Sequence, residues 1–94
     1  MSFRVVWLSD ALDALAASYL YARRKKRDPE EITRAMAAID RELEARPTTA
    51  GESRYGNNRI LIVNPLTIYF EVHDDEHVVV VTALRYHVRH GSSS

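Results

Sequence analysis

Apolar and polar residues follow two different periods along the chain, and the change of period divides the chain into two parts. Between residues 9 and 46, apolar side chains recur every three or four positions, the spacing of amphipathic helices. From residue 59 onward they gather in short runs separated by turn signals, the pattern of consecutive antiparallel strands. The pattern therefore predicts an α+β fold in which two helices precede a three-stranded meander.

The meander comprises three predicted strands, Arg59–Val63, Leu66–Val72 and His77–Leu84. Asn64-Pro65 closes the first strand, since proline fixes φ and biases the residue before it away from helix. Asp74-Asp75-Glu76 forms a charged turn after the second. Strict alternation in the second strand predicts one buried and one exposed face, and the exposed face holds Thr67, Tyr69, Glu71 and His73. The third strand contains four consecutive valines, which favour burial on both faces.

The first part of the chain opens with a predicted strand, Phe3–Leu8, and continues into a helix that ends near Arg24. Ser9-Asp10 is the predicted N-cap of this helix. Its apolar stripe, at the spacing of an amphipathic helix, consists of Leu8, Leu12, Leu15 and Tyr19.

A second helix begins with a strong start signal. Asp28 can cap it, Pro29 suits the first helical position, and Glu31 stands at the capping-box position. Its stripe consists of Ile32, Met36, Ile39 and Leu43. Arg46-Pro47 ends the helix, and a polar loop over residues 48–58 leads into the meander. We therefore expect the order β-α-α-β-β-β, with a mainly antiparallel sheet packed against a two-helix hairpin.

Composition predicts one domain over residues 1–90, with a disordered polar tail at 91–94. The chain has no cysteine, which excludes disulfides and cysteine-ligated zinc. It shows neither a signal peptide nor a membrane-spanning run, so we expect a cytoplasmic protein without membrane contact. A domain of 94 residues is only marginally stable, so a partner or homodimerisation would help it. No motif calls for a cofactor or metal ion.

Charge balances overall, with thirteen basic and thirteen acidic side chains, but it is unevenly distributed. Residues 1–27 carry six basic and two acidic groups, so any polyanion should bind a patch. The patch contains five consecutive cations, Arg23, Arg24, Lys25, Lys26 and Arg27. These cations can bind nucleic-acid phosphates. Alternatively, they are solvated side chains at the end of the first helix, where they interact favourably with the negative end of the helix dipole.

A second group of candidate residues follows the last strand. It combines arginines with groups that transfer protons, and its members are Arg85, Tyr86, His87, Arg89 and His90. Metal-independent RNA cleavage needs a base, an acid and cations that stabilise the transition state, and these residue types supply all three. Arg54 and Arg59 could join the group from the loop side, and Tyr69 could stack on a base. The alternative is a solvated tail with ordinary surface charges, and a tyrosine that packs under a loop.

The same features, in this order, resemble the RelE/ParE superfamily of type II toxins over roughly residues 3–87. The stretches that carry the resemblance are Trp7-Leu8-Ser9-Asp10-Ala11-Leu12, Gly51-Glu52-Ser53-Arg54, Arg59-Ile60-Leu61 and Pro65-Leu66. The resemblance implies an antiparallel sheet with a helical hairpin on one face and a cognate antitoxin as partner. It also implies one of two targets, because members act either on mRNA at the ribosome or on DNA gyrase.

Carried onto this sequence, the endonuclease branch of the superfamily matches Arg85 with an arginine after the last strand, and Tyr86 or His87 with the acid or base. Thr67 stands where another arginine would be expected. The first hypothesis is therefore a ribosome-dependent mRNA endonuclease in which Arg85 and Arg59 stabilise phosphate. The second is a non-catalytic binder, either a gyrase poison or an inactive relative, which Thr67 favours. The third is a plain interaction module.

Overall fold

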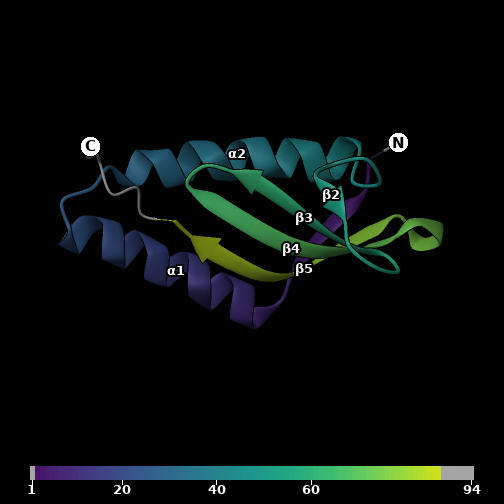
Figure 1. Ribbon diagram of the computed structural model, residues 1–94, viewed down its shortest axis with the longest axis horizontal. Helices are drawn as coiled ribbons and strands as arrows, with labels where there is room; N and C mark the ends of the chain where they lie inside the picture. The colour runs from purple at the N-terminus through teal and green to yellow at the C-terminus, as the bar shows by residue number, and fades with distance from the viewer. Residues whose placement is uncertain (1, 88–94) are drawn as a thin grey trace.

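Five strands and two helices make up the computed structural model, which describes residues 2–87 (Figure 1). In chain order the elements are β1 (Arg4–Trp7), α1 (Ser9–Arg24), α2 (Pro29–Ala45), β2 (Glu52–Ser53), β3 (Asn58–Val63), β4 (Leu66–His73), the 3₁₀ turn η1 (Asp74–Glu76) and β5 (Val78–Tyr86). This is the α+β order that the sequence pattern predicts, with one addition. The two-residue strand β2 lies inside the predicted loop at 48–58, and it is too short to leave a periodic signal.

The strands form a single sheet in the order β1-β5-β4-β3-β2. β3, β4 and β5 form the predicted antiparallel meander, whereas β1 pairs with β5 in parallel and places the start of the chain beside its last strand. Leu8 extends this pairing, because its backbone N–H donates to the carbonyl of Val81 at 3.0 Å. A bulge between Tyr69 and Phe70 interrupts the ladder between β4 and β5.

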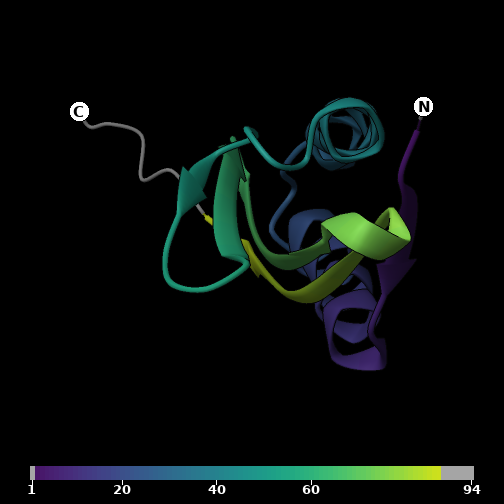
Figure 2. The same cartoon turned by 90° about the vertical axis from the view of Figure 1, so that its right-hand side faces the viewer.

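The hydrophobic core lies between the sheet and the two helices, which the two views place beside the curved sheet (Figures 1 and 2). Alternate residues of β4 supply much of it, as the strand period requires, and these are Leu66, Ile68, Phe70 and Val72. The predicted stripe of α2 is confirmed, since Ile32, Ile39 and Leu43 are fully buried and Met36 is partly buried.

The predicted stripe of α1 is wrong in its first half. Leu8 and Leu12 are 44% and 49% exposed. The buried face of α1 instead consists of small residues, Ala11, Ser18 and Ala22. Small side chains let the helix axis approach the sheet closely, and the larger leucines then lie outside the contact.

Helix starts differ between the two helices. Asp28 caps α2 as predicted, because its Oδ1 accepts a hydrogen bond from the backbone N–H of Glu30 at 2.9 Å. The predicted cap of α1 is wrong: Ser9 is already helical, and Leu8 precedes the helix without a side-chain cap. Within the described residues, no helix has the length and apolar character needed to cross a bilayer.

Within residues 2–87, no helix or strand covers the face of the sheet opposite the helices, and we call it the open face. The expectation that the valines of β5 are buried on both sides is therefore wrong. Val79 and Val81 are fully buried against the helices, whereas Val78 and Val80 on the open face are only half-buried. This difference leaves a half-exposed surface on which functional side chains can stand.

Candidate nucleic-acid interface

Strand register fixes which predicted site residues share the open face. Thr67 pairs with Arg85 across β4 and β5, and Ile62 pairs with Thr67 across β3 and β4. Because side chains alternate along a strand, the side chain of Arg85 lies on the open face and that of Tyr86 on the helix face. The next alternation brings His87 back to the open face. Arg85, Thr67 and His87 therefore form one group.

His87 is held in place by two hydrogen bonds. Its backbone N–H donates to the carbonyl of Pro65 at 2.7 Å, so the chain stays bound to the β3–β4 turn after β5 ends. A side-chain hydrogen bond joins His87 Nε2 to Thr67 Oγ1. Thr67 is only 5% exposed although it lies on the open face. The position where an arginine was expected thus carries the hydroxyl that orients the histidine ring.

Tyr86 occupies a different environment from His87. Its ring packs edge-on against Tyr21 of α1, with a centroid separation of 5.9 Å and an interplanar angle of 69°. Edge-to-face pairs of aromatic rings stabilise the fold by more than the area they bury. Of the two predicted acid or base candidates, the structure places His87 beside Arg85, and it places Tyr86 on the side of the sheet that faces the helices.

Arg59 does not join the Arg85 group. In the β3–β4 register it pairs with Phe70, whose side chain is in the core. Its Nε donates to the carbonyl of Ala50 at 2.8 Å and its Nη2 to that of Gly51 at 3.3 Å. Arg59 therefore ties the loop before β2 onto the sheet. Two of the five N–H donors of its guanidinium are thereby directed at carbonyl oxygens.

A second group of predicted residues meets near the bulge of β4. Arg54, Tyr69 and Arg59 line one cavity of about 530 Å³, together with Tyr55, Asn58, Ile60, Phe70, Thr82 and Ala83. Tyr69 pairs with Ile60 and Ala83 on the neighbouring strands, so its ring stands on the open face one row away from Arg85. Arg54 interacts only weakly with Glu52, at 4.0 Å and with both side chains more than half exposed. Tyr55, 78% exposed, is an aromatic residue at this site that the sequence analysis missed.

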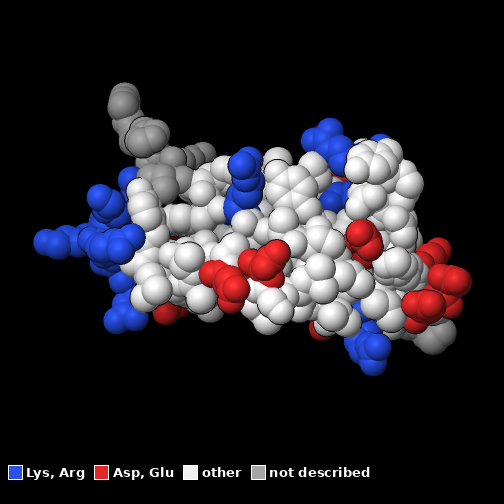
Figure 3. All heavy atoms as spheres, turned by 90° about the horizontal axis from the view of Figure 1, so that it is seen from below, with Lys and Arg blue, Asp and Glu red and all other residues white. Residues whose placement is uncertain are grey.

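The basic run lies at one end of the elongated molecule. All five side chains, residues 23–27, are exposed. Figure 3 shows basic groups gathered at the end where α1 meets α2 and acidic groups at the opposite end, where η1 carries Asp74, Asp75 and Glu76. The long axis measures 43 Å, so the basic run and the acidic turn are far apart. A polyanion will therefore approach the basic end first.

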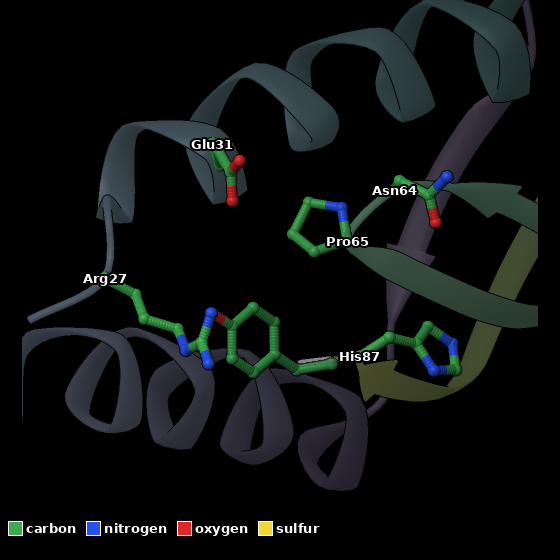
Figure 4. A pocket seen from close by; sticks show the side chains of 6 residues that line it. Arg27, Glu31, Asn64, Pro65 and His87 are labelled. Carbon is green, nitrogen blue, oxygen red and sulfur yellow. The ribbon is translucent and has the colours of Figure 1, made fainter. Parts of the chain in front are cut away.

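The basic end and the end of β5 share a cavity of about 220 Å³ (Figure 4). We call it the hairpin cavity, and its lining residues are Arg27, Glu31, Asn64, Pro65, Tyr86 and His87. Two groups predicted separately, the basic run and the residues after the last strand, therefore meet here. Glu31 and Asn64 were read only as cap and turn residues, because sequence alone does not show that these two turns are neighbours.

The remaining histidines are engaged elsewhere. His73 Nε2 lies 3.3 Å from Glu71 Oε1, and the ring of His77 packs against Phe3 with centroids 5.1 Å apart. Within residues 2–87, no three histidine, aspartate or glutamate side chains are grouped so that they could hold a metal ion. The candidates Arg89 and His90, like the predicted tail at 91–94, lie outside the described residues.

Comparison with solved structures decides the fold. One chain of the toxin–antitoxin complex RelBE2 from Mycobacterium tuberculosis superimposes with a TM-score of 0.68 and 12% sequence identity, covering 95% of both chains. A chain of the chromosomal ParDE TA system from P. aeruginosa gives a TM-score of 0.70 and 17% identity, covering 92% of this chain and 97% of the other. The chain has a RelE/ParE-type toxin fold. No family model and no curated protein matches the sequence.

Proposed function

We propose that this RelE/ParE-type chain is the toxin of a toxin–antitoxin system and cleaves mRNA on the ribosome. The observation that carries this proposal is the grouping of Arg85, Thr67 and His87 on the open face. Of the groups that a metal-independent ribonuclease requires, the arginine supplies a cation beside the phosphate and the oriented histidine supplies one proton-transfer group. The fold shared with chains of the toxin–antitoxin complexes RelBE2 and ParDE supports the assignment to a toxin–antitoxin system.

Each residue of the group has a chemical role in this proposal. Arg85 binds the scissile phosphate, because its planar guanidinium matches two phosphate oxygens and neutralises the charge that develops on them. In the cleavage step the 2′-oxygen bonds to phosphorus as the bond from phosphorus to the 5′-oxygen breaks. His87 either takes the proton of the attacking 2′-hydroxyl or donates one to the leaving 5′-oxygen, and water carries out the other proton transfer. Thr67 engages Nε2, which leaves Nδ1 as the ring nitrogen available for this transfer. Thr67 thus orients the ring.

The surroundings of the group suit single-stranded RNA. Tyr69 stands one row away on the same face and can stack on a base, since stacking tolerates any base. The exposed cations at residues 23–27 lie at the end where β5 finishes and can hold the phosphates that follow. Their contribution should fall steeply as salt concentration rises.

A reconstituted translation complex tests the proposal. Purified ribosomes are programmed with a defined mRNA, the protein is added, and cut sites are mapped by primer extension with and without ribosomes. We expect cleavage only on ribosomes, and a loss of about 100-fold or more in Arg85→Ala. Arg41→Ala, which removes an exposed arginine from α2, is the matched control and should cleave normally. Intact mRNA with excess wild-type protein would refute the endonuclease.

A gyrase poison is the second candidate function. Two observations favour it: Thr67 stands where an arginine was expected, and Arg59 is bound to loop carbonyls, so Arg85 is the one guanidinium in the Arg85 group within residues 2–87. The similarity to ParDE is as strong as that to RelBE2. In this case, added protein would stabilise double-strand breaks by purified gyrase and leave ribosome-bound mRNA intact.

Either function requires an antitoxin, which we propose is an acidic segment that occupies the open face and the basic end. Such a segment would complement the exposed cations at residues 23–27 and cover Arg85. Co-expression with the neighbouring reading frame, followed by co-purification at rising salt, tests this partner. A complex that forms equally well with Arg85→Ala and with a charge-neutral basic run would contradict the placement.

A further inference from the structure

The hairpin cavity lies between three chain segments that the mechanism above does not use together. These are the α1–α2 turn, the β3–β4 turn and the end of β5. Figure 4 shows the side chains of Arg27, Glu31 and Pro65 directed toward a common space, whereas the ring of His87 points away from it. The cavity is therefore separate from the Arg85 group, although His87 contributes to the walls of both.

Arg27 is positioned by the way α1 ends. Its backbone N–H donates to the carbonyl of Ala22 at 2.7 Å, and the N–H of Lys26 donates to that of Arg23 at 3.2 Å. This is the Schellman pattern of helix termination, with Lys26 in the left-handed conformation at φ 57°. The turn directs the Arg27 side chain into the cavity. No hydrogen bond or ion pair engages its guanidinium within residues 2–87.

Glu31 stands at the capping-box position of α2 but does not complete the box. Asp28 caps the helix through Glu30, and no side-chain hydrogen bond returns from Glu31 to Asp28 within residues 2–87. The carboxylate faces the cavity instead. Arg27 and Glu31 therefore present a donor group and an acceptor group to the same space without pairing with each other.

We propose that the hairpin cavity binds one base of the single-stranded RNA substrate and selects guanine. At about 220 Å³ the cavity is smaller than sites for drug-sized ligands, and it suits a single flat base. Tyr86 and Pro65 supply the apolar walls against which a base ring can pack. Proteins that read RNA sequence commonly hold unstacked bases in this way.

The two charged groups determine which base fits. A carboxylate accepts hydrogen bonds only, so Glu31 requires a base edge with N–H donors. Arg27 requires acceptors, and arginine matches the O6 and N7 of guanine. Guanine alone among the four bases carries two adjacent N–H donors, at N1 and N2, beside this pair of acceptors. Uracil, cytosine and adenine each offer a single donor group, and none of them has the paired O6 and N7 acceptors of guanine.

This inference rests on the proposed function, because it places a base of the same RNA next to the cleavage site. Three consecutive residues at the end of β5 and just after it connect the two sites: Arg85 and His87 lie on the open face, and Tyr86 lines the cavity behind it. A strand of RNA that crosses the end of β5 can therefore keep its scissile phosphate at Arg85 and insert a neighbouring base into the cavity.

Nucleotide binding tests the inference without requiring cleavage. The full chain is titrated with GMP, AMP, CMP and UMP, and separately with inorganic phosphate, while backbone amide signals of Glu31 and Tyr86 are followed by NMR. We expect GMP to bind about ten-fold more tightly than the other nucleotides. Glu31→Gln should remove the preference, whereas Glu30→Gln, one position earlier in the same helical turn, should keep it. Equal binding of all four nucleotides, or equal shifts with phosphate alone, overturns the inference.

The two proposals can fail separately. A protein that binds GMP selectively but leaves ribosome-bound mRNA intact refutes the endonuclease and retains the base site. A protein that cleaves mRNA, with cut sites unchanged in Glu31→Gln and without a guanine at a fixed distance from the cut, refutes the base site and retains the endonuclease.

Discussion

Replacing Thr67 with valine removes one hydroxyl from the open face and changes little else. The two side chains have nearly the same shape, and Thr67 is only 5% exposed, so the methyl groups stay packed. What is lost is the hydrogen bond to His87 Nε2. Thr67→Val therefore changes what orients the His87 ring while the ring itself remains. A substitution of His87 removes both at once.

The size of the effect follows from the geometry. One neutral hydrogen bond contributes about 1 kcal/mol to stability, so Thr67→Val should lower the free energy of unfolding by about that amount. In a domain of this size, this corresponds to a fall of about 5 °C in the unfolding midpoint. The cleavage rate should fall further, by about ten-fold to a hundred-fold, because a misplaced catalytic group costs much more in rate than in stability.

Two controls isolate the effect on His87. Thr67→Ser keeps the hydroxyl and should cleave at about the rate of the wild type. Thr82→Val removes a hydroxyl of the same sheet that donates to the carbonyl of Tyr69 at 3.2 Å, so it should lower stability comparably and leave cleavage unchanged. Nitrogen-15 NMR of the imidazole reports which ring nitrogen carries the proton. The balance between the two tautomers of His87 should change in Thr67→Val and in neither control.

Some results would refute this reasoning. If Thr67→Val leaves both the tautomer balance and the cleavage rate as they are in the wild type, Thr67 does not orient His87. If Thr82→Val slows cleavage as much as Thr67→Val does, the loss follows from reduced stability.

Three further substitutions test the structure itself. Burial and the neighbouring Glu44 raise the pKa of Asp40 above its ordinary 3.8, so its charged form disfavours folding. Asp40→Asn should therefore raise the unfolding temperature at pH 7, and the gain should vanish below the ordinary pKa, where both states are protonated. Gly51→Ala should lower the free energy of unfolding, measured in urea, by about 2–3 kcal/mol. The added Cβ would collide with the Ile60 carbonyl, and Gly51 also has a φ of 64°, which alanine adopts at a cost. Lys26→Gly should raise the free energy of unfolding by about 0.5 kcal/mol in the same assay, because Lys26 has the left-handed backbone conformation that glycine adopts without strain.

Local patterns predicted the elements well where one period governed a whole segment. The alternation of β4 identified its buried face, and Asp28-Pro29 marked the start of α2, because both signals depend on neighbouring residues alone. The stripe of α1 was misassigned because a helix packed closely on a sheet buries alanine and serine, which a hydrophobicity pattern underrates. β2 has two residues and exists only through pairing with β3.

The candidate site was predictable in its residue types but not in its grouping. Ending the last strand at Leu84 hid the alternation that separates Tyr86 from Arg85 and His87. Had the strand been extended by two residues, as the structure has it, period two would have assigned them to opposite faces. The contact between Thr67 and His87, twenty positions apart, depends on the register of β4 and β5. The bulge between Tyr69 and Phe70 shifts this register, and the sequence analysis did not predict the bulge.

Cleavage of ribosome-bound mRNA by His87→Ala and Tyr86→Phe, measured side by side, tests the central claim most directly. The two residues are adjacent in sequence, with Tyr86 the last residue of β5, but their side chains face opposite sides of the sheet. Tyr86→Phe keeps the ring that packs on Tyr21. If the open face carries the reaction, His87→Ala loses about 100-fold or more in rate and Tyr86→Phe cleaves like the wild type. Loss of cleavage in Tyr86→Phe with full activity in His87→Ala would contradict it.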